Sequence, residues 1–197
     1  MIDIDVLLSW GASYKKIKEE EIIFKEGTSC NFYYQLVSGR VRWVNINEAG
    51  KEFIQNIIEP GESFGELPLF DDGPYAATAI ADEDSVLLRL CKPTFLHLIK
   101  ENPDIHFAFT RLITERLRFK FMLLKELAFH NPEHRIFTLL NHYKKLHKLN
   151  DSRKYHVNLT RQQIADMTGL RVETVIRTIR NLHNRGELLI ERGKVYC

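Results

Sequence analysis

Cysteine is scarce in this sequence of 197 residues, and the three cysteines present lie far apart. Cys30, Cys91 and Cys197 are odd in number, and no two of them have the close spacing of paired metal ligands. We therefore expect neither a disulfide framework nor a cysteine-based zinc site. We interpret Cys30 and Cys91 as small core or surface residues, and we expect the terminal Cys197 to be exposed.

The sequence also lacks long apolar runs and a strong excess of charge. No stretch reaches the roughly 18 apolar residues of a transmembrane helix, and Asp3 and Asp5 stand where a signal peptide carries positive charge. We therefore expect a cytoplasmic protein with no membrane partner. The net charge is only +2, but Lys and Arg outnumber Asp and Glu between residues 153 and 197. This local excess favours nucleic-acid binding by the C-terminal region.

Residues 159–190 have the pattern of a helix-turn-helix. Thr160 can cap the first helix, and Gln163 completes a capping-box pattern three residues later. Gly169 stands where the turn must reverse, often through a positive φ that glycine adopts at little cost. Apolar residues of the second helix repeat at helical spacing and predict a buried face. They are Val175, Ile179 and Leu182.

The opposite face of the second helix carries side chains suited to DNA. An arginine can donate to O6 and N7 of guanine, and a glutamate can accept from N4 of cytosine. Glu173 and Arg177 lie one turn apart, so they can contact neighbouring bases and pair with each other. Four further side chains are placed for phosphates, which fix the register of the protein on DNA. They are Thr160, Arg161, Arg171 and Arg180.

Residues 187–196 predict two short strands around Arg192, Gly193 and Lys194, which is the pattern of a β-wing with a basic tip. Cap, turn, buried face and wing together predict a winged helix that binds double-stranded DNA. The alternative is an amphipathic helical hairpin whose charges are only solvated.

Residues 20–91 predict a series of short strands. Segments 22–24, 32–37, 41–46, 53–58 and 85–90 are rich in β-branched and aromatic residues. Glycines at positions 27, 39, 50 and 61 recur every eleven or twelve residues and mark turns. This spacing indicates an antiparallel sandwich of the jelly-roll type.

Residues 103–130 predict one long helix that begins at Asn102-Pro103 and ends at a hinge near Asn131-Pro132. One stripe has the spacing of a two-stranded coiled coil and predicts a dimer seam. It consists of Ile113, Leu117, Lys120, Leu124 and Leu127. A second apolar stripe can pack on the jelly roll. It consists of Ile105, Phe109, Leu112, Phe119 and Leu123. Residues 133–148 predict the first helix of the DNA-binding domain.

With these features, the sequence resembles the CRP/FNR superfamily of bacterial transcription regulators over nearly its whole length. Residues 172–177 are similar to the recognition helix of the FNR branch, in which the residues matched by Glu173 and Arg177 read a G·C pair. The CRP branch has a further base-reading arginine where this sequence has Val172, which can contact a thymine methyl group but cannot donate to guanine. The resemblance therefore implies a palindromic operator with a TTGA-like core, a homodimer, and RNA polymerase as a partner.

Residues 60–70 resemble the phosphate-binding cassette of cyclic-nucleotide-binding domains. In that cassette a short helix begins at a Gly-Glu-Leu, whose glutamate holds the ribose. This sequence matches it with Gly65, Glu66 and Leu67.

Other positions depart from the cassette of cAMP-binding members. The arginine and the serine or threonine that bind the cyclic phosphate are replaced by Ala76 and Ala77. A buried phosphate without a counter-charge is costly. The Thr-Ser pair that contacts adenine falls at Lys120 and Phe121. We therefore expect that cAMP is not a ligand.

Cofactors are not expected from the other motifs either. The close set of N-terminal cysteines that holds the iron–sulfur cluster of the FNR branch is absent from the sequence. Among eight histidines, neither His97 nor His106 is singled out as a haem ligand. Two hypotheses for the cassette remain: it is a structural turn of an inherited scaffold, or it binds another small effector with Lys120 supplying positive charge.

The predicted fold is α+β. It has an N-terminal antiparallel β jelly roll in residues 1–101, a dimerisation helix and hinge in 102–131, and a C-terminal winged helix-turn-helix in 132–197. The predicted function is that of a homodimeric, sequence-specific transcription regulator that does not respond to cAMP. The alternative is a small-ligand sensor of the cyclic-nucleotide class whose winged helix contacts proteins. The sequence shows no metal-ligand spacing, P-loop or nucleophile–base pair, so no metal site is predicted and an enzyme is the weakest hypothesis.

Overall fold

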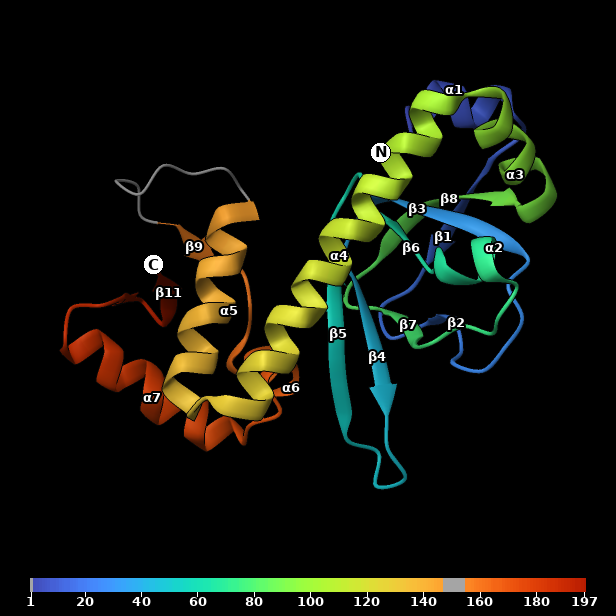
Figure 1. The fold of residues 1–197 in the computed structure, drawn as a ribbon. Coiled ribbons are helices and arrows are strands. Elements are labelled where there is room, and N and C mark those ends of the chain that lie inside the picture. The colour runs from blue at the N-terminus through green and yellow to red at the C-terminus, as the bar shows by residue number, and fades with distance from the viewer. Residues whose placement is uncertain (1, 147–154) are drawn as a thin grey trace. The chain divides into compact units, whose positions relative to one another are not determined.

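A computed structural model of the protein describes residues 2–146 and 155–197 (Figure 1). The chain divides into two compact units, residues 1–114 and residues 115–197. The long helix α4 (Pro103–Phe129) runs from the first unit into the second. The three domain ranges given above, with boundaries after residues 101 and 131, stay predictions.

The first unit is built from two four-stranded antiparallel sheets that follow a short helix, α1 (Ile4–Ser9). One sheet has the strand order β1-β8-β3-β6. Its strands are β1 (Ser13–Ile17), β8 (Ser85–Cys91), β3 (Phe32–Ser38) and β6 (Ser63–Phe64). The other sheet has the order β2-β7-β4-β5. Its strands are β2 (Ile22–Phe24), β7 (Thr78–Ala81), β4 (Val41–Ile46) and β5 (Glu52–Ile58). The predicted jelly roll is confirmed.

The core of this unit is formed by the inward side chains of both sheets. Leu36, Val41 and Leu87 have no exposed surface. The turn between β3 and β4 requires glycine, because Gly39 has φ 89° and an added Cβ would lie 2.2 Å from Ser85 Oγ. The predicted turn at this position is therefore present and sterically fixed.

Five of these strands were expected from the sequence, whereas β1, β6, β7 and the helices α1 and α3 (Lys92–Glu101) were not. Strand β6 has only two residues, and β7 consists of small residues with one isoleucine, so neither carries an alternating pattern. Strand β1 contains two lysines and is largely exposed. Their pairing with neighbouring strands, not their intrinsic propensity, makes these segments strands.

A half-buried ion-pair network joins segments that are distant in sequence. The guanidinium of Arg42 on β4 lies 2.9 Å from Glu52, 2.8 Å from Asp82 and 2.8 Å from Glu20. Burial alone would lower the pKa of Arg42, but the hydrogen bonds that its guanidinium donates to these carboxylates raise the pKa above its ordinary value. Only 11% of the Arg42 side chain and 12% of the Asp82 side chain are exposed, whereas Glu20 is 67% exposed, so the pair of Arg42 with Asp82 is the buried part of the network.

The first turns of α4 pack on the jelly roll. Phe109 is 3% exposed, and its ring makes edge contacts with the rings of Tyr33 and Phe95. Ile105 and Leu112 are partly buried against the same core. This part of the predicted second stripe is confirmed. Phe119, further along the stripe, stacks on His142 of α5 (Pro132–Leu146) with ring centroids 4.1 Å apart.

The second unit contains three helices that are closely packed and a small sheet. After α5 come β9 (His156–Val157), α6 (Arg161–Thr168) and α7 (Val172–Asn184). The strands β10 (Leu189–Glu191) and β11 (Lys194–Tyr196) form the predicted wing, and β9 adds a third strand in the order β10-β11-β9. The predicted end of the first helix, at residues 147 and 148, lies outside the described residues.

The three cysteines are free thiols. Cys30 is buried and Cys91 is exposed, as expected for core and surface residues. The expectation of an exposed Cys197 is wrong: its backbone pairs with that of Tyr155 through hydrogen bonds of 3.0 and 3.1 Å, and burial raises the pKa of its thiol. The pairing holds the C-terminal residue beside β9.

Candidate nucleic-acid interface

Helix α6 begins and ends as its sequence predicts. The hydroxyl of Thr160 accepts a hydrogen bond of 3.0 Å from the backbone N–H of Gln163. The side-chain oxygen of Gln163 accepts one of 3.0 Å from the backbone N–H of Thr160, which completes the capping box. Gly169 ends the helix with φ 68°, in the left-handed region that glycine adopts most easily. These features fix the turn between α6 and α7.

Helix α7 has one buried face and one exposed face. Val175, Ile179 and Leu182 are at most 1% exposed, and the helix packs against α5 and α6. The predicted DNA-contacting residues on the other face are exposed. They are Arg171, Glu173, Arg177 and Arg180. Val172, at the first position of the helix, is partly buried. The helix therefore presents a charged face of the kind that enters a major groove.

The expected pairing of Glu173 with Arg177 is not formed. Within residues 2–146 and 155–197, no hydrogen bond or ion pair joins the two side chains, although they lie one turn apart. On a helix surface in water, such a pair stabilises the helix by only about 0.3 kcal/mol. This is too little to hold two exposed side chains together. Both groups extend into solvent.

Arg161 connects α6 to the wing. Its Nη2 donates a hydrogen bond of 3.2 Å to the carbonyl oxygen of Gly193 at the wing tip. Burial lowers the pKa of Arg161, but an arginine remains charged at neutral pH. The predicted phosphate contacts of Arg161 and of the exposed Thr160 stay predictions. The structure adds that Arg161 also positions the wing.

A surface ion pair that the sequence pattern does not reveal joins α7 to α5. Arg185, the residue after α7, contacts both carboxylate oxygens of Glu133 in the first turn of α5, at 2.5 and 3.2 Å. The guanidinium lowers the pKa of Glu133. The two residues are 52 positions apart, so only the packed helices bring them together.

The cassette of the jelly roll has the predicted short helix. Gly65, with φ 69°, follows β6, and α2 (Leu67–Asp71) begins after Glu66. Glu66 is 1% exposed, whereas Leu67 is 39% exposed. These residues adopt the conformation that the resemblance implies.

Aromatic side chains pack directly against this cassette. The ring of Tyr75 stacks on that of Phe24 with centroids 3.8 Å apart, and its hydroxyl donates to Cys30 Sγ at 3.2 Å. A Cβ added at Gly65 would lie 2.6 Å from the Phe24 ring and 3.0 Å from Tyr75. The space beside the cassette glycine is therefore occupied by aromatic rings of the protein itself.

The two alanines at the expected phosphate-binding positions have different environments. Ala76 is exposed, and its carbonyl oxygen accepts a hydrogen bond from the side chain of Asn45 at 2.8 Å. Ala77 is buried, and its carbonyl oxygen accepts a hydrogen bond of 3.2 Å from the indole N–H of Trp43. Neither side chain can neutralise a phosphate.

Lys120 and Phe121 lie on α4 in the second unit, and their predicted proximity to an effector stays a prediction. Burial lowers the pKa of Lys120 to about 8, and the positive charge of Arg116 adds to this effect. Phe121 is 64% exposed. Lys120 is thus a partly neutral group near pH 8 rather than a fixed counter-charge.

Sequence reasoning missed one group of polar side chains in the second unit, at the junction of α4 and α5. Glu126, His130 and His134 bring their ligand atoms within 4.8 Å of one another. Their only signal in the sequence is a spacing of four residues, which is common on helices.

The structure combines three features. They are a recognition helix followed by a wing, a long helix, and a jelly roll of the cyclic-nucleotide-binding type. These features are those of a two-part, DNA-binding regulator.

Known proteins show the same combination. Residues 14–102 match the family described as the cyclic nucleotide-binding domain, and residues 134–196 match the Crp-like helix-turn-helix domain. The cAMP-activated global transcriptional regulator CRP of Pasteurella multocida is 30% identical over 97% of this chain and 93% of its own length. The cyclic AMP receptor protein of Thermus thermophilus is 28% identical over 98% of this chain and 87% of its own.

A solved structure shares the fold. The structure of FixK2 from Bradyrhizobium japonicum has a TM-score of 0.78 at 22% identity, covering 94% of this chain and 91% of that one.

The chain belongs to the CRP/FNR family of transcription regulators. It is a DNA-binding regulator, and the relatives are regulators rather than enzymes, which confirms the predicted class. In the described part of the chain, no helix combines the length and hydropathy needed to cross a membrane.

Proposed function

We propose that the protein is a homodimer that recognises a palindromic operator with a TTGA-like core and does so without cAMP. The observation that carries this proposal is the exposed pair Glu173 and Arg177 on α7, opposite the buried face of that helix. A glutamate and an arginine one turn apart can contact a cytosine and a guanine in adjacent base pairs. Val172, just before them, offers only an apolar contact, which suits the methyl group of thymine.

The dimer is supported by apolar side chains along α4. Leu117 is 53% exposed and Leu124 is 61% exposed, although both are large aliphatic residues. Ile113 and Leu127 on the same stripe are partly buried. A second copy that covers this stripe would bury it in a coiled-coil seam. Two-fold symmetry would then place two copies of α7 at half-sites one DNA turn apart. RNA polymerase is the proposed partner of the DNA-bound dimer.

Independence from cAMP is supported by the cassette. Ala76 and Ala77 supply no positive charge, and Tyr75 and Phe24 pack against Gly65 where a nucleotide would need space. A phosphate buried there would lose its hydration without gaining a counter-ion. A different effector would have to act elsewhere or displace these rings.

The proposal is tested by fluorescence anisotropy of the purified full-length chain on a labelled palindrome with TTGA half-sites, against a scrambled duplex of equal composition. We expect selective binding that is unchanged by cAMP, and sedimentation velocity should show a dimer. Selective binding only in the presence of cAMP would disprove the cAMP-independent part. Equal binding to both duplexes would disprove the operator assignment, and a monomer at micromolar concentration would disprove the seam.

A further inference from the structure

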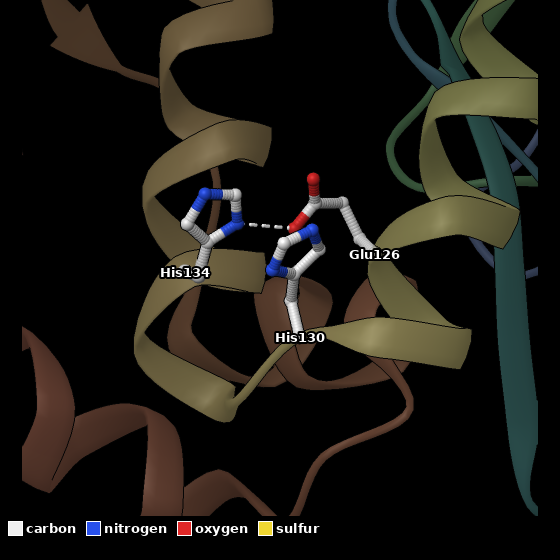
Figure 2. Close-up of side chains that lie close together, drawn as sticks. All are labelled: Glu126, His130 and His134. Carbon is white, nitrogen blue, oxygen red and sulfur yellow. Dashed lines mark hydrogen bonds and ion pairs between the residues drawn. The ribbon is translucent and has the colours of Figure 1, made fainter.

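Three potential metal ligands converge where α4 ends and α5 begins (Figure 2). Glu126 lies in the last turn of α4, His130 directly follows that helix, and His134 lies in the first turn of α5. Their ligand atoms all lie within 4.8 Å of one another. All three residues belong to the second compact unit, so their proximity is set within one body.

The interruption of the helix between α4 and α5 creates this convergence. Residues four apart on a continuous helix drift by about 40° around the axis at each step, so Glu126 and His134 would diverge. Instead, Asn131 accepts a hydrogen bond of 3.0 Å from the backbone N–H of His134 and starts a new helix. The change of direction at Asn131-Pro132 brings His134 back beside Glu126 (Figure 2).

Arg135 fixes the other side of the junction. Its guanidinium donates hydrogen bonds of 2.9 Å to the carbonyl oxygens of His130 and Leu127, which would otherwise be unsatisfied at the end of α4. The backbone positions of the three potential ligands are therefore held by capping interactions from both helices. Such support is what a preorganised site requires.

The three side chains lie in direct contact with one another. Glu126 Oε2 and His134 Nδ1 lie 2.5 Å apart, and the rings of His130 and His134 stack with centroids 4.1 Å apart and planes 18° apart. The carboxylate oxygen of Glu126 and the imidazole nitrogen of His134 are therefore within hydrogen-bonding distance. Glu126 is 5% exposed, whereas half of the His134 side chain is exposed. The cluster therefore has a buried carboxylate on one side and an imidazole that is accessible to solvent on the other.

We propose that Glu126, His130 and His134 form a binding site for one divalent transition-metal ion, with Zn²⁺ as the best-suited ion. Two imidazoles and one carboxylate are the donor set of open zinc sites, in which water takes the fourth position. For Nδ1 of His134 to bind the ion, that nitrogen must carry no proton, and the one proton of the neutral ring then lies on Nε2.

A shared ion sets the separation that the three ligand atoms must reach. Zinc ligands at about 2.0–2.1 Å in a tetrahedral site lie roughly 3.3 Å from one another. Binding would therefore draw together the present spread of up to 4.8 Å, open the 2.5 Å contact and turn at least one of the two stacked imidazole rings. The exposed side of His134 leaves room for a water ligand.

A metal bound here links the last turn of α4 to the first turn of α5 through side chains. It would therefore stiffen the junction that follows the proposed dimer helix. Binding of the ion itself does not depend on the proposed operator or on dimerisation, so its test can fail or succeed independently of them.

The test is a zinc titration of the full-length chain, first treated with a chelator and desalted, in competition with a chromophoric zinc indicator. We expect one tightly bound ion per chain, and Co²⁺ in place of Zn²⁺ should give the intense visible absorption of a four-coordinate site. Glu126→Gln, His130→Ala and His134→Ala should each weaken binding by roughly tenfold or more.

A matched control is available on α3. His97 and Glu101 are four residues apart, with 4.0 Å between Nδ1 and Oε1, but both are exposed, and no third ligand joins them among the residues that the structure describes. The variant His97→Ala should bind zinc like the parent.

Thermal unfolding separates a metal site from a purely structural role. Zinc should raise the Tm of the parent and of His97→Ala but not that of Glu126→Gln, which keeps a hydrogen bond to His134. If the parent binds no more zinc than His130→Ala and His134→Ala do, or if Co²⁺ gives no such absorption, the proposal is wrong. The cluster then has only a structural role, in which the pair of Glu126 and His134 connects α4 with α5.

Discussion

Tyr75 and Phe24 lie face to face inside the jelly roll, with ring centroids 3.8 Å apart and planes inclined by 9°. The Tyr75 hydroxyl is also bound to Cys30, and the residue is 3% exposed. The side chain therefore fills the interior beside the cassette glycine Gly65.

Tyr75→Ala should destabilise the jelly roll strongly. The variant loses a stacked ring and leaves a cavity, so we expect the free energy of unfolding to fall by about 3 kcal/mol. Chemical denaturation followed by circular dichroism measures the change. Tyr14→Ala, which removes a tyrosine that is 53% exposed, is the control and should stay close to the parent. Equal effects of the two variants would contradict the packing role of Tyr75.

Arg42→Met should also be costly. The substitution keeps the length of the side chain but leaves the carboxylates of Glu52 and Asp82 without their cation, and only 12% of the Asp82 side chain is exposed. Loss of one partner from a buried ion pair typically costs about 3–5 kcal/mol. Urea denaturation at neutral pH checks the value. Lys18→Met removes an exposed pair with Asp84 and should change stability little.

His142 should make the stability of the second unit sensitive to acid. Burial, together with the charge of Lys145, lowers the pKa of His142 from 6.5 to about 4. Between these values the unfolded chain binds a proton that the folded chain does not. The neutral, buried His142 therefore contributes stability that is complete above pH 6.5 and is lost as the pH falls toward 4.

The test compares Tm values between pH 7.5 and pH 5 for the parent and for His142→Phe, which can still stack on Phe119. The variant should lose less stability on acidification than the parent. His97→Phe, at an exposed histidine, should behave like the parent. A parent and a His142→Phe variant with the same pH dependence would show that His142 titrates normally in the folded state.

Arg177→Ala should weaken binding to the proposed operator by about 1–3 kcal/mol per half-site and relax selectivity at one G·C pair. We expect this loss because alanine cannot make the base contact proposed for the guanidinium. Anisotropy titrations against operators substituted at each position measure it. Identical selectivity in parent and variant would exclude a base-reading role for Arg177.

Arg161→Ala should have a different signature. The variant loses a charge near the DNA backbone and the hydrogen bond to Gly193 that positions the wing. Affinity for operator and scrambled duplexes should therefore fall together, with a shallower dependence on salt concentration. A loss confined to the operator would indicate that Arg161 reads sequence instead.

The sequence by itself determined the elements whose signals are local. The cap at Thr160, the turn at Gly169 and the apolar spacing of α7 depend on contacts within a few residues, and each is present in the structure. The β-branched and aromatic segments and the turn glycines between residues 20 and 61 likewise indicated the jelly roll, because strand propensity and turn conformation are set by adjacent residues.

Only the tertiary structure decided features that depend on residues far apart in the chain. Strand β7, the Arg42 network and the contact between Arg185 and Glu133 arise from packing of distant segments, which no local pattern encodes. The stacking of Tyr75 on Phe24 likewise joins residues that are distant in the sequence. Glu126 and His134 became neighbours because the chain changes direction at Asn131-Pro132, and a spacing of residues along one helix cannot anticipate that turn.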